Sequence, residues 1–202
     1  KTEVADMNAK AKALDQKLNL ALMSLPNILD RDIPDGEDEN QNIEIFSWGQ
    51  PREIDNPKEH FEIAAAIHGM DFETAAKLSG SRFVVLRGTI ARLHRALAQF
   101  MLDVHVNEHG LTETMTPVLV REEAMFGTNQ LPKFSEDMYH SEIDNLWLIP
   151  TAEVPITNIH KNEILSEDDL PKKYTAYSAC FRREAGSYGK ETKGFLRLHQ
   201  FN

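Results

Sequence analysis

The sequence predicts an α+β fold in which a mostly antiparallel sheet is flanked by helices. Three observations lead to this prediction. A long amphipathic helical pattern follows residue 89, short β-branched runs lie on either side of it, and the connections between these runs are long and rich in glycine and proline. Short strands separated by long connections favour antiparallel pairing over the regular alternation of a parallel sheet.

Residues 1–23 are expected to form a helix. Six apolar residues recur at three- and four-residue spacing: Val4, Met7, Ala11, Leu14, Leu18 and Leu22. The pattern has no N-terminal cap, so we expect a longer helix or helical hairpin before Lys1; a short surface helix is the alternative. The stretch 24–42, with two prolines, a glycine and six acidic residues, predicts a linker.

The next elements are expected in the order short strand, two short helices, strand and long helix. Residues 43–49 alternate as in an edge strand, 60–69 and 71–80 are helical patterns that each end in a glycine, and 82–88 is a β-branched run typical of a buried strand. The long helix starts at Thr89, a plausible cap, and continues to Gly110. Its apolar face comprises Ile90, Leu93, Leu97, Phe100, Met101 and Val104.

The second half of the chain predicts further short strands. Residues 111–120 form a strand with an edge position or irregularity near Pro117, because proline cannot donate to a β ladder. A helical beginning follows at 121, and 146–150 form a strand before another short helix. The last two strands are expected at 175–181 and 194–201, on either side of a glycine-containing loop.

Composition excludes several classes of protein. The formal net charge of −10 argues against broad, charge-driven binding of nucleic acid, which needs a basic face. No apolar run approaches the ~18 residues of a membrane span. Cys180 is the one cysteine, which fits a reducing cytosol, and beside Phe181 it is better explained as a small buried hydrophobe than as a nucleophile.

The tract 181–201 is locally basic in this acidic chain. Five cations face only Glu184 and Glu191; they are Arg182, Arg183, Lys190, Lys193 and Arg197. If the flanking strands pair, alternation places Arg197, His199 and Phe201 on one side of the sheet. Arginine grips phosphate or carboxylate, and an aromatic ring can stack on a base, so the tract can form a nucleoside triphosphate platform. A solvated hairpin with surface ion pairs is the alternative.

Other candidate sites are less distinctive. Thr151 and Glu153 follow the strand at 146–150, and a hydroxyl beside a carboxylate suits an ammonium group; a helix cap with an exposed acid is the alternative reading. The eight histidines show no HExxH spacing or pairing with cysteine, which argues against zinc. The sequence has no Walker A, GxGxxG or GxSxG element, so nucleotide binding would not use a P-loop or a Rossmann turn.

Taken together, these motifs resemble the seryl-tRNA synthetases of bacterial type, a family of class II aminoacyl-tRNA synthetases. The matching stretches, in order, are "LPNILDRDIPDGEDENQN", "GSRFVVLRG", "RLHRAL", "LPKF", "LIPTAEVPITN" and "FRREAGSYGKETKGFLRLHQF". The resemblance extends from about Leu25 to the end of the chain. It implies a class II catalytic domain, in which the long helix and the strand around Pro117 form a homodimer interface and the basic tract forms the ATP-binding hairpin.

The resemblance also implies roles for individual residues. Arg182 would bind the ATP α-phosphate and the serine carboxylate, Glu184 would lie near the adenine amino group, and Arg197 would hold the distal phosphates; these three are the implied catalytic residues. Phe201 would stack on adenine, with Leu198 also at the ATP site. Thr151 and Glu153 would help to form the serine pocket. The loop 186–194 would move between ATP and the tRNA acceptor end, and Arg183 stands where many relatives have a small polar residue.

The implied activity is that of a cytoplasmic serine–tRNA ligase. Serine attacks ATP to give seryl-adenylate, with Mg²⁺ as the metal ion, and the seryl group passes to tRNA(Ser), with tRNA(Sec) left open. Such catalysis depends on positioning and charge stabilisation and needs no protein nucleophile. By this resemblance, residues 1–23 are the end of a coiled-coil arm that binds tRNA, 24–42 the linker, and 43–202 the N-terminal portion of the catalytic domain.

The third class II signature and the later residues that bind Mg²⁺ and serine would follow Asn202. We therefore expect no metal site within the 202 residues, and no serine-dependent ATP–pyrophosphate exchange by them alone. Two alternatives to a serine–tRNA ligase stay open. One is a related ligase that charges a carrier protein, although the heptad-like residues 1–23 count against it, and the other is a non-catalytic paralogue that acts as a binding module.

Overall fold

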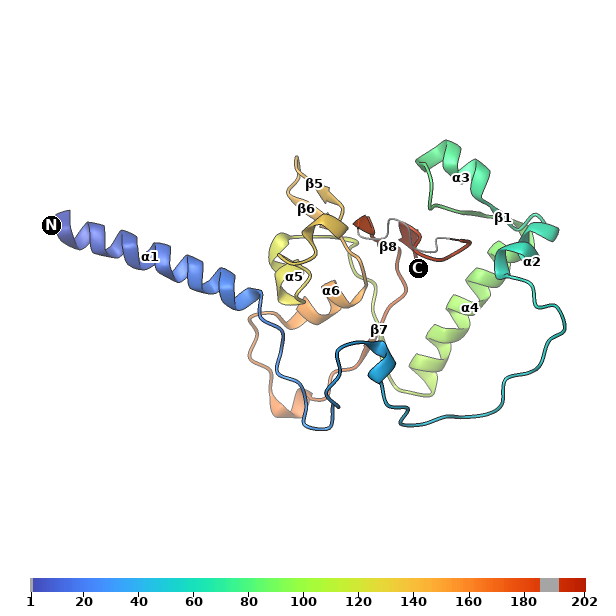
Figure 1. Ribbon diagram of the computed structural model, residues 1–202, viewed down its shortest axis with the longest axis horizontal. Coiled ribbons are helices and arrows are strands. Elements are labelled where there is room, and N and C mark those ends of the chain that lie inside the picture. Colours follow the sequence, from blue (N-terminus) through green and yellow to red (C-terminus); the bar gives the residue numbers. More distant parts are fainter. Residues whose placement is uncertain (1, 186–192) are drawn as a thin grey trace. The chain divides into compact units, whose positions relative to one another are not determined.

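A computed structural model describes residues 2–185 and 193–202 of the chain. The backbone divides into two units, Lys1–Pro57 and Lys58–Asn202, and each is described by itself. Most of the secondary structure belongs to the second unit (Figure 1). None of the described helices is long and apolar enough to cross a lipid bilayer.

The first unit contains the predicted N-terminal helix. Helix α1 spans Thr2–Met23, and a short 3-10 turn, η1, spans Glu39–Gln41 within an otherwise irregular segment. The predicted strand at 43–49 is wrong, because these residues have no strand to pair with and their side chains face solvent: Ile45 is 94% exposed and Trp48 88% exposed. The expected domain start at residue 43 falls inside this unit.

The second unit opens with two short helices and a two-stranded ladder. Helices α2 (His60–Ala66) and α3 (Phe72–Ser79) confirm the two helical predictions. Strand β1 (Met70–Asp71) pairs antiparallel with β2 (Val85–Leu86), the part of the predicted strand 82–88 that is extended and paired; β2 is half-buried rather than fully buried.

The predicted glycine cap is confirmed for α3, whereas α2 ends differently. Gly80 follows α3 with a φ of +91°, and its amide bonds the carbonyl of Ala76. After α2 the left-handed residue is His68, with a φ of +49°, and the amide of Gly69 closes the helix on the carbonyl of Ala64. A side chain at Gly69 would collide with Ile90, so packing rather than helix capping explains that glycine.

The long predicted helix is α4, Gly88–Asn107. It begins one residue before Thr89, with Arg87 as the N-cap residue and no side-chain cap hydrogen bond, so Thr89 is not the cap. Ala98 is buried, whereas the larger apolar side chains of the predicted core face are mostly exposed, with Phe100 64% exposed. Helical periodicity located this apolar face correctly, but it did not predict that most of the face would be exposed to solvent.

The predicted strand at 111–120 is two strands separated by an irregular stretch that contains Pro117. Strand β3 (Thr112–Glu113) pairs in parallel with β7 (Tyr174–Thr175), and β4 (Leu119–Val120) pairs antiparallel with β6 (Leu146–Leu148). The expected irregularity near Pro117 is therefore confirmed, because the chain changes its pairing partner there.

The main core lies where β6 packs near two short helices. Strand β6 is the centre of a three-stranded antiparallel sheet with β4 and β5 (His140–Ser141), and helices α5 (Glu122–Gly127) and α6 (Glu153–Thr157) contact each other. Short 3-10 turns lie at Ser135–Asp137 (η2), Asn158–His160 (η3) and Glu167–Asp169 (η4). The buried cluster consists of Val120, Met125, Leu131, Met138, Ile149 and Val154.

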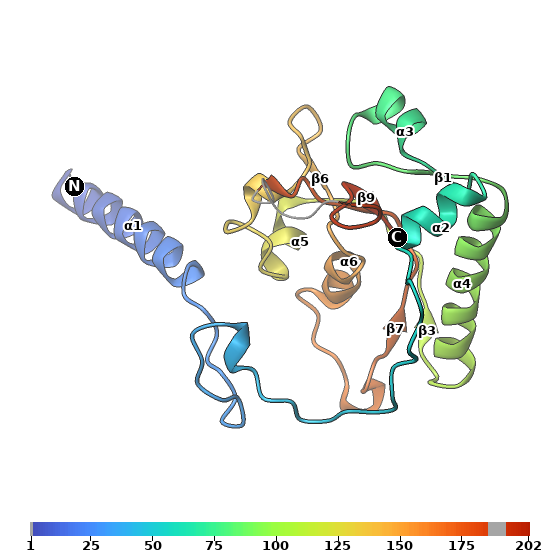
Figure 2. The same cartoon turned by 45° about the vertical axis from the view of Figure 1, so that its right-hand side comes forward.

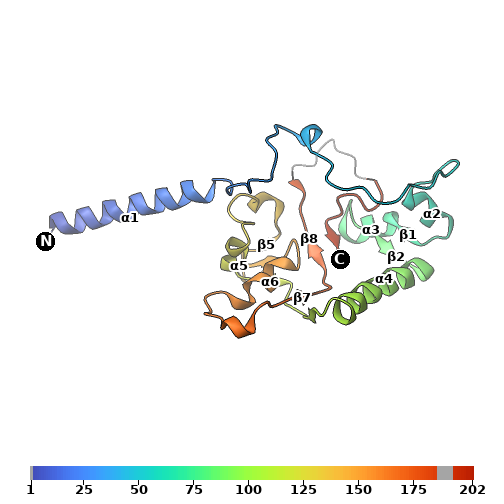
Figure 3. The same cartoon turned by 90° about the horizontal axis from the view of Figure 1, so that it is seen from below.

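The basic tract forms a short antiparallel hairpin. Strand β8 (Cys180–Phe181), labelled in Figure 3, pairs with β9 (Gln200–Phe201) just before the C-terminus. In this register Cys180 lies opposite Phe201. Cys180 is a buried free thiol, as predicted. The expected returning strand from Gly194 is wrong, since the chain turns through 194–197 and is extended only at β9. We call residues 180–185 the outgoing arm and 193–201 the returning arm.

Candidate active site

A pocket of about 240 Å³ lies between the outgoing arm and the core of the second unit. It is lined by Gln130, Phe134, Asp137, Met138, Pro150, Thr151, Arg182 and Glu184. Three residues that the sequence analysis singled out, Thr151, Arg182 and Glu184, therefore share one cavity although they lie on separate segments of the chain. The cavity offers both charge signs and a hydroxyl, which suits a zwitterionic ligand.

Arg182 is fixed between the pocket and the returning arm. Its Nε donates to the carbonyl of Pro150 at 3.2 Å, and its guanidinium carbon lies 4.9 Å from the centre of the Phe201 ring. Its backbone amide donates to the carbonyl of His199 at 2.9 Å. The β8–β9 register thus places a cation against an aromatic ring on one face of the hairpin, as strand alternation predicted for Phe201.

Glu184 and Arg197 form an ion pair across the two arms. Arg197 Nη1 lies 3.0 Å from Glu184 Oε2, and the glutamate side chain is the more shielded, at 17% exposed against 40% for the arginine. Both residues have a left-handed backbone, with φ of +52° at Glu184 and +56° at Arg197. The strand alternation predicted for Arg197 therefore does not apply, because the residue lies in the turn before β9.

Of the two residues expected at the serine pocket, one lines the cavity and the other faces solvent. Thr151 lines the pocket, whereas Glu153 begins helix α6 and is exposed. The Thr151 hydroxyl accepts a 3.4 Å hydrogen bond from the amide of Glu153, so the threonine also supports the start of the helix. In this structure only the threonine of the pair contributes directly to the cavity lining.

Two further predictions fall elsewhere. Leu198 is buried and lines a different pocket, of about 440 Å³, together with Phe83, Val84, Leu86, His94, Phe195, Gln200, Phe201 and Asn202. The greater part of the loop 186–194, with Lys190 and Glu191, lies outside the described residues. Gly194 is the described end of that loop.

Asp137 belongs to the site although the sequence analysis did not select it. Its carboxylate accepts a 2.7 Å hydrogen bond from the amide of Ala185, and its backbone carbonyl accepts one of 2.7 Å from the amide of Arg183. It thereby supports the outgoing arm from the turn η2. No local pattern distinguished this residue from the other acids near it, since its partners lie more than forty positions away.

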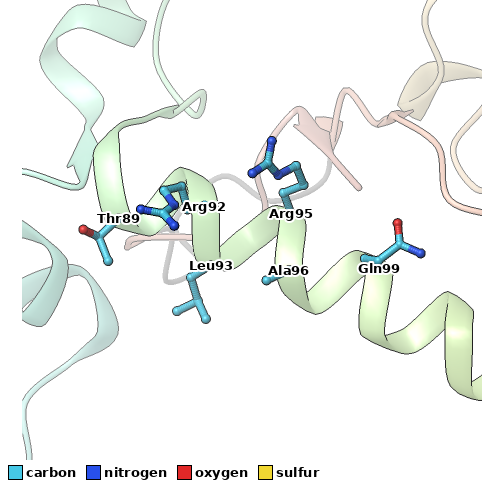
Figure 4. Close-up of a pocket in the computed structure, with 6 residues that line it drawn as sticks. All are labelled: Thr89, Arg92, Leu93, Arg95, Ala96 and Gln99. Atoms are coloured by element: carbon cyan, nitrogen blue, oxygen red, sulfur yellow. The ribbon is translucent and has the colours of Figure 1, made fainter.

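A larger and shallower depression, of about 630 Å³, lies on helix α4 and contains none of the predicted site residues (Figure 4). Arg92, Arg95 and Gln99 line it with polar groups along one side of the helix. Within residues 2–185 and 193–202, no three histidine, cysteine, aspartate or glutamate side chains are grouped so as to hold a metal ion.

Comparison with known proteins shows similarity to class II tRNA synthetases. Residues 134–202 match the model of the tRNA synthetase class II core domain (G, H, P, S and T). The whole chain is 58% identical to a serine–tRNA ligase of Ruegeria pomeroyi and 56% identical to one of Paracoccus denitrificans, covering 47% of each. The chain thus spans about half the length of the curated relatives it matches.

Solved structures agree with the sequence comparison. A seryl-tRNA synthetase from Pyrococcus horikoshii complexed with ATP matches 98% of this chain with a TM-score of 0.89 and 38% identity, and the chain covers 48% of it. A cytoplasmic serine–tRNA ligase from Naegleria fowleri in complex with AMP matches 98% with a TM-score of 0.85 and 28% identity, and the chain covers 47% of it. The chain therefore has the class II core fold and is similar over its whole length to part of the seryl-tRNA synthetases.

Proposed function

We propose that the full-length protein is a serine–tRNA ligase, which activates L-serine with ATP and transfers it to tRNA(Ser). The observation that carries the proposal is the identity of 58% to a serine–tRNA ligase over the entire chain. Activation forms a bond between the serine carboxylate and the α-phosphorus of ATP, with pyrophosphate as the leaving group. The tRNA ribose hydroxyl then displaces AMP from the adenylate.

The pocket geometry supports separate roles for Arg182, Arg197 and Glu184 in binding ATP. Arg182 is held by Pro150 beside Phe201, so its remaining nitrogens can donate to the α-phosphate while the ring stacks on adenine. Arg197 would hold the distal phosphates and Glu184 the adenine amino group, and in the ligand-free chain these two residues neutralise each other. Leu198 supports this arm from the buried side.

At the amino-acid end, Thr151 supplies a hydroxyl in the same cavity as Arg182. The guanidinium would bind the serine carboxylate, and the threonine would bind the ammonium or the hydroxyl of serine. Glu153 would have to turn towards the cavity to take part. A site that hydrogen-bonds a substrate hydroxyl rejects an analogue that lacks it, so alanine should be excluded more strongly than size alone allows.

The remaining partners are also proposals. Residues 1–23 would be the end of the arm that binds tRNA, 24–42 the linker and 43–202 part of the catalytic domain, in a cytoplasmic homodimer that contacts its partner through α4 and the chain around Pro117. Mg²⁺ would accompany ATP and neutralise phosphate charge. The described residues offer no cluster of metal ligands, so no step is assigned to the ion here.

Serine-dependent exchange between ATP and pyrophosphate by the full-length protein tests the proposal. We expect exchange with serine and none with alanine. Arg182→Ala should reduce kcat/KM by at least about 100-fold, the usual effect of losing a group that stabilises transition-state charge. Arg183→Ala is the matched control, because its exposed side chain is adjacent while its amide bond to Asp137 is kept. Equal effects of the two changes would contradict the assignment of Arg182.

A further inference from the structure

The returning arm is irregular between residues 193 and 199, yet it carries Arg197 at a defined position. Several of its contacts run to the segment 58–87, which holds α2, β1, α3 and β2, and which contributes no residue to the 240 Å³ pocket. Figure 2 labels α2 and β9, and the side chain of His60 at the start of α2 bonds the amide of Phe195 in the returning arm. The segment 58–87 could therefore act on the proposed ATP site only through the returning arm.

Arg82 brackets the returning arm on both sides of Leu198. Its side-chain Nε donates to the carbonyl of Arg197 at 2.8 Å, and its own carbonyl accepts a hydrogen bond from the amide of His199 at 2.9 Å. The Phe83 ring lies 5.4 Å from the His199 ring. Arg82 thus makes the two hydrogen bonds that a neighbouring strand would otherwise make to residues 197–199. These bonds fix the backbone of Arg197.

His60 holds the arm at a second point. Its Nε2 accepts a 2.9 Å hydrogen bond from the amide of Phe195, and the two rings lie 5.4 Å apart at 35°. Gly194 has a φ of +58°, and a Cβ there would lie 2.2 Å from His60 Nε2. The close approach therefore requires glycine at 194 and a neutral ring whose Nε2 carries no hydrogen.

The outgoing arm is supported by Asp137, whose carbonyl and carboxylate accept hydrogen bonds from the amides of Arg183 and Ala185, and it is also bonded to the returning arm through the amide of Arg182. We propose that Arg82 and His60 are positioning residues for the returning arm, so that the segment 58–87 sets the place of Arg197, whereas Asp137 supports the outgoing arm at Arg183 and Ala185. This inference rests on the proposed function, since it assigns the returning arm to the distal phosphates of ATP.

Steady-state exchange kinetics of the full-length protein separate the two ends of the site. Arg82→Met keeps the aliphatic stem and removes the donor, and the loss of one hydrogen bond should raise the KM for ATP about five- to tenfold. The KM for serine should change less than about twofold, because Arg182 and Thr151 have other supports. Arg52→Met, at an exposed arginine of the other unit, is the control. Equal rises in both KM values would overturn the proposal.

His60 provides a test that does not depend on activity. His60→Gln keeps an acceptor near the position of Nε2, whereas His60→Phe keeps a ring and removes the acceptor. Hydrogen exchange at the Phe195 amide should accelerate in the phenylalanine variant and stay slow in the glutamine variant, and the KM for ATP should follow the same order. Equal exchange in both variants would refute the role of His60.

The two kinds of measurement also separate this inference from the proposed function. A wild-type protein without serine-dependent exchange contradicts the ligase proposal, while the amide protection of Phe195 and His199 still tests the support given by His60 and Arg82. An active wild type with unchanged ATP kinetics in both Arg82→Met and His60→Phe contradicts the positioning role alone.

Discussion

Asp71 shows how a single carboxylate links local structure to pH. It caps helix α3, accepting hydrogen bonds of 2.8 Å from the amide of Thr74 and 2.7 Å from its hydroxyl, and it lies 2.9 Å from Arg87. The amide bond chiefly, then the hydroxyl bond, outweigh the opposing effect of desolvation, and with smaller contributions from the charges of Arg87 and Lys77 they hold the pKa of Asp71 below its ordinary value of 3.8. The carboxylate therefore stabilises the folded state in its charged form.

Asp71→Ala should lower the Tm of the full-length protein at pH 7 by about 2–4 °C, the scale expected for a lost helix cap. Because the folded-state pKa is depressed, this stabilisation is complete above pH 3.8 and is lost as the pH falls through the lower folded value. The difference in Tm between wild type and variant should shrink in that acidic range. Calorimetry with exposed Glu73→Ala as control checks this, and a difference independent of pH would refute it.

Several site residues were predictable one at a time, whereas their supports were not. Arg182, Glu184 and Phe201 stood out because a basic, glycine-rich tract in an acidic chain is unusual, and family resemblance gave them roles. Asp137, His60 and Arg82 act through hydrogen bonds to residues 48, 135 and 115 positions away. No periodicity or local spacing encodes such contacts, so only the folded chain reveals them.

At the scale of elements, helices were predicted better than strands. Helical hydrogen bonds are local, and α1, α2, α3 and α4 follow from spacing alone. A strand needs a partner whose distance along the chain the sequence does not state. Among the described residues the predicted strand at 43–49 has none, and the returning arm turns at 194–197, where Arg82 bonds the carbonyl of Arg197, and joins a ladder only at β9.

Asn158 is a point where two elements depend on one side chain. Its Nδ2 donates to the carbonyls of Ala124 at 3.0 Å and Val154 at 2.8 Å, which belong to α5 and α6. Asn158→Ala leaves both half-buried carbonyls without this donor. We expect a loss of about 1–3 kcal/mol in the free energy of unfolding.

Urea denaturation of the full-length protein measures this loss, provided that the m-value stays constant. Thr157→Ala, the change of an exposed neighbour, should leave the midpoint almost unaltered. A midpoint for Asn158→Ala equal to that of the control would show that the two helices are held together by other contacts.

At the scale of the whole molecule, the exposed face of α4 supports the proposed homodimer. Leu93, Leu97 and Phe100 lie on this face at half exposure or more, and Met115 is exposed in the irregular stretch before Pro117. An exposed apolar helix face of this kind is typical of an interaction site. An isologous contact would bury the same residues from both protomers.

Leu97→Glu should therefore convert a dimer of the full-length protein into a monomer at about micromolar concentration, because an unpaired carboxylate would be buried at the contact. Sedimentation velocity measures the change in mass. Leu78→Glu, on an exposed position of α3, is the matched control and should leave the mass unchanged. An unaltered dimer in Leu97→Glu would place the interface elsewhere.

The ion pair between Glu184 and Arg197 has a consequence for nucleotide selectivity. In the free chain each residue already satisfies the other, so a nucleotide that separates them must compensate both charges. With the proposed roles, ATP would do so, since its phosphates would bind the arginine and its adenine amino group would bind the glutamate. GTP lacks that amino group and AMP lacks the distal phosphates, so each would compensate only one of the two charges. Breaking the ion pair therefore costs free energy that only a nucleotide with both an adenine amino group and distal phosphates would recover, and this difference would favour ATP over GTP and AMP.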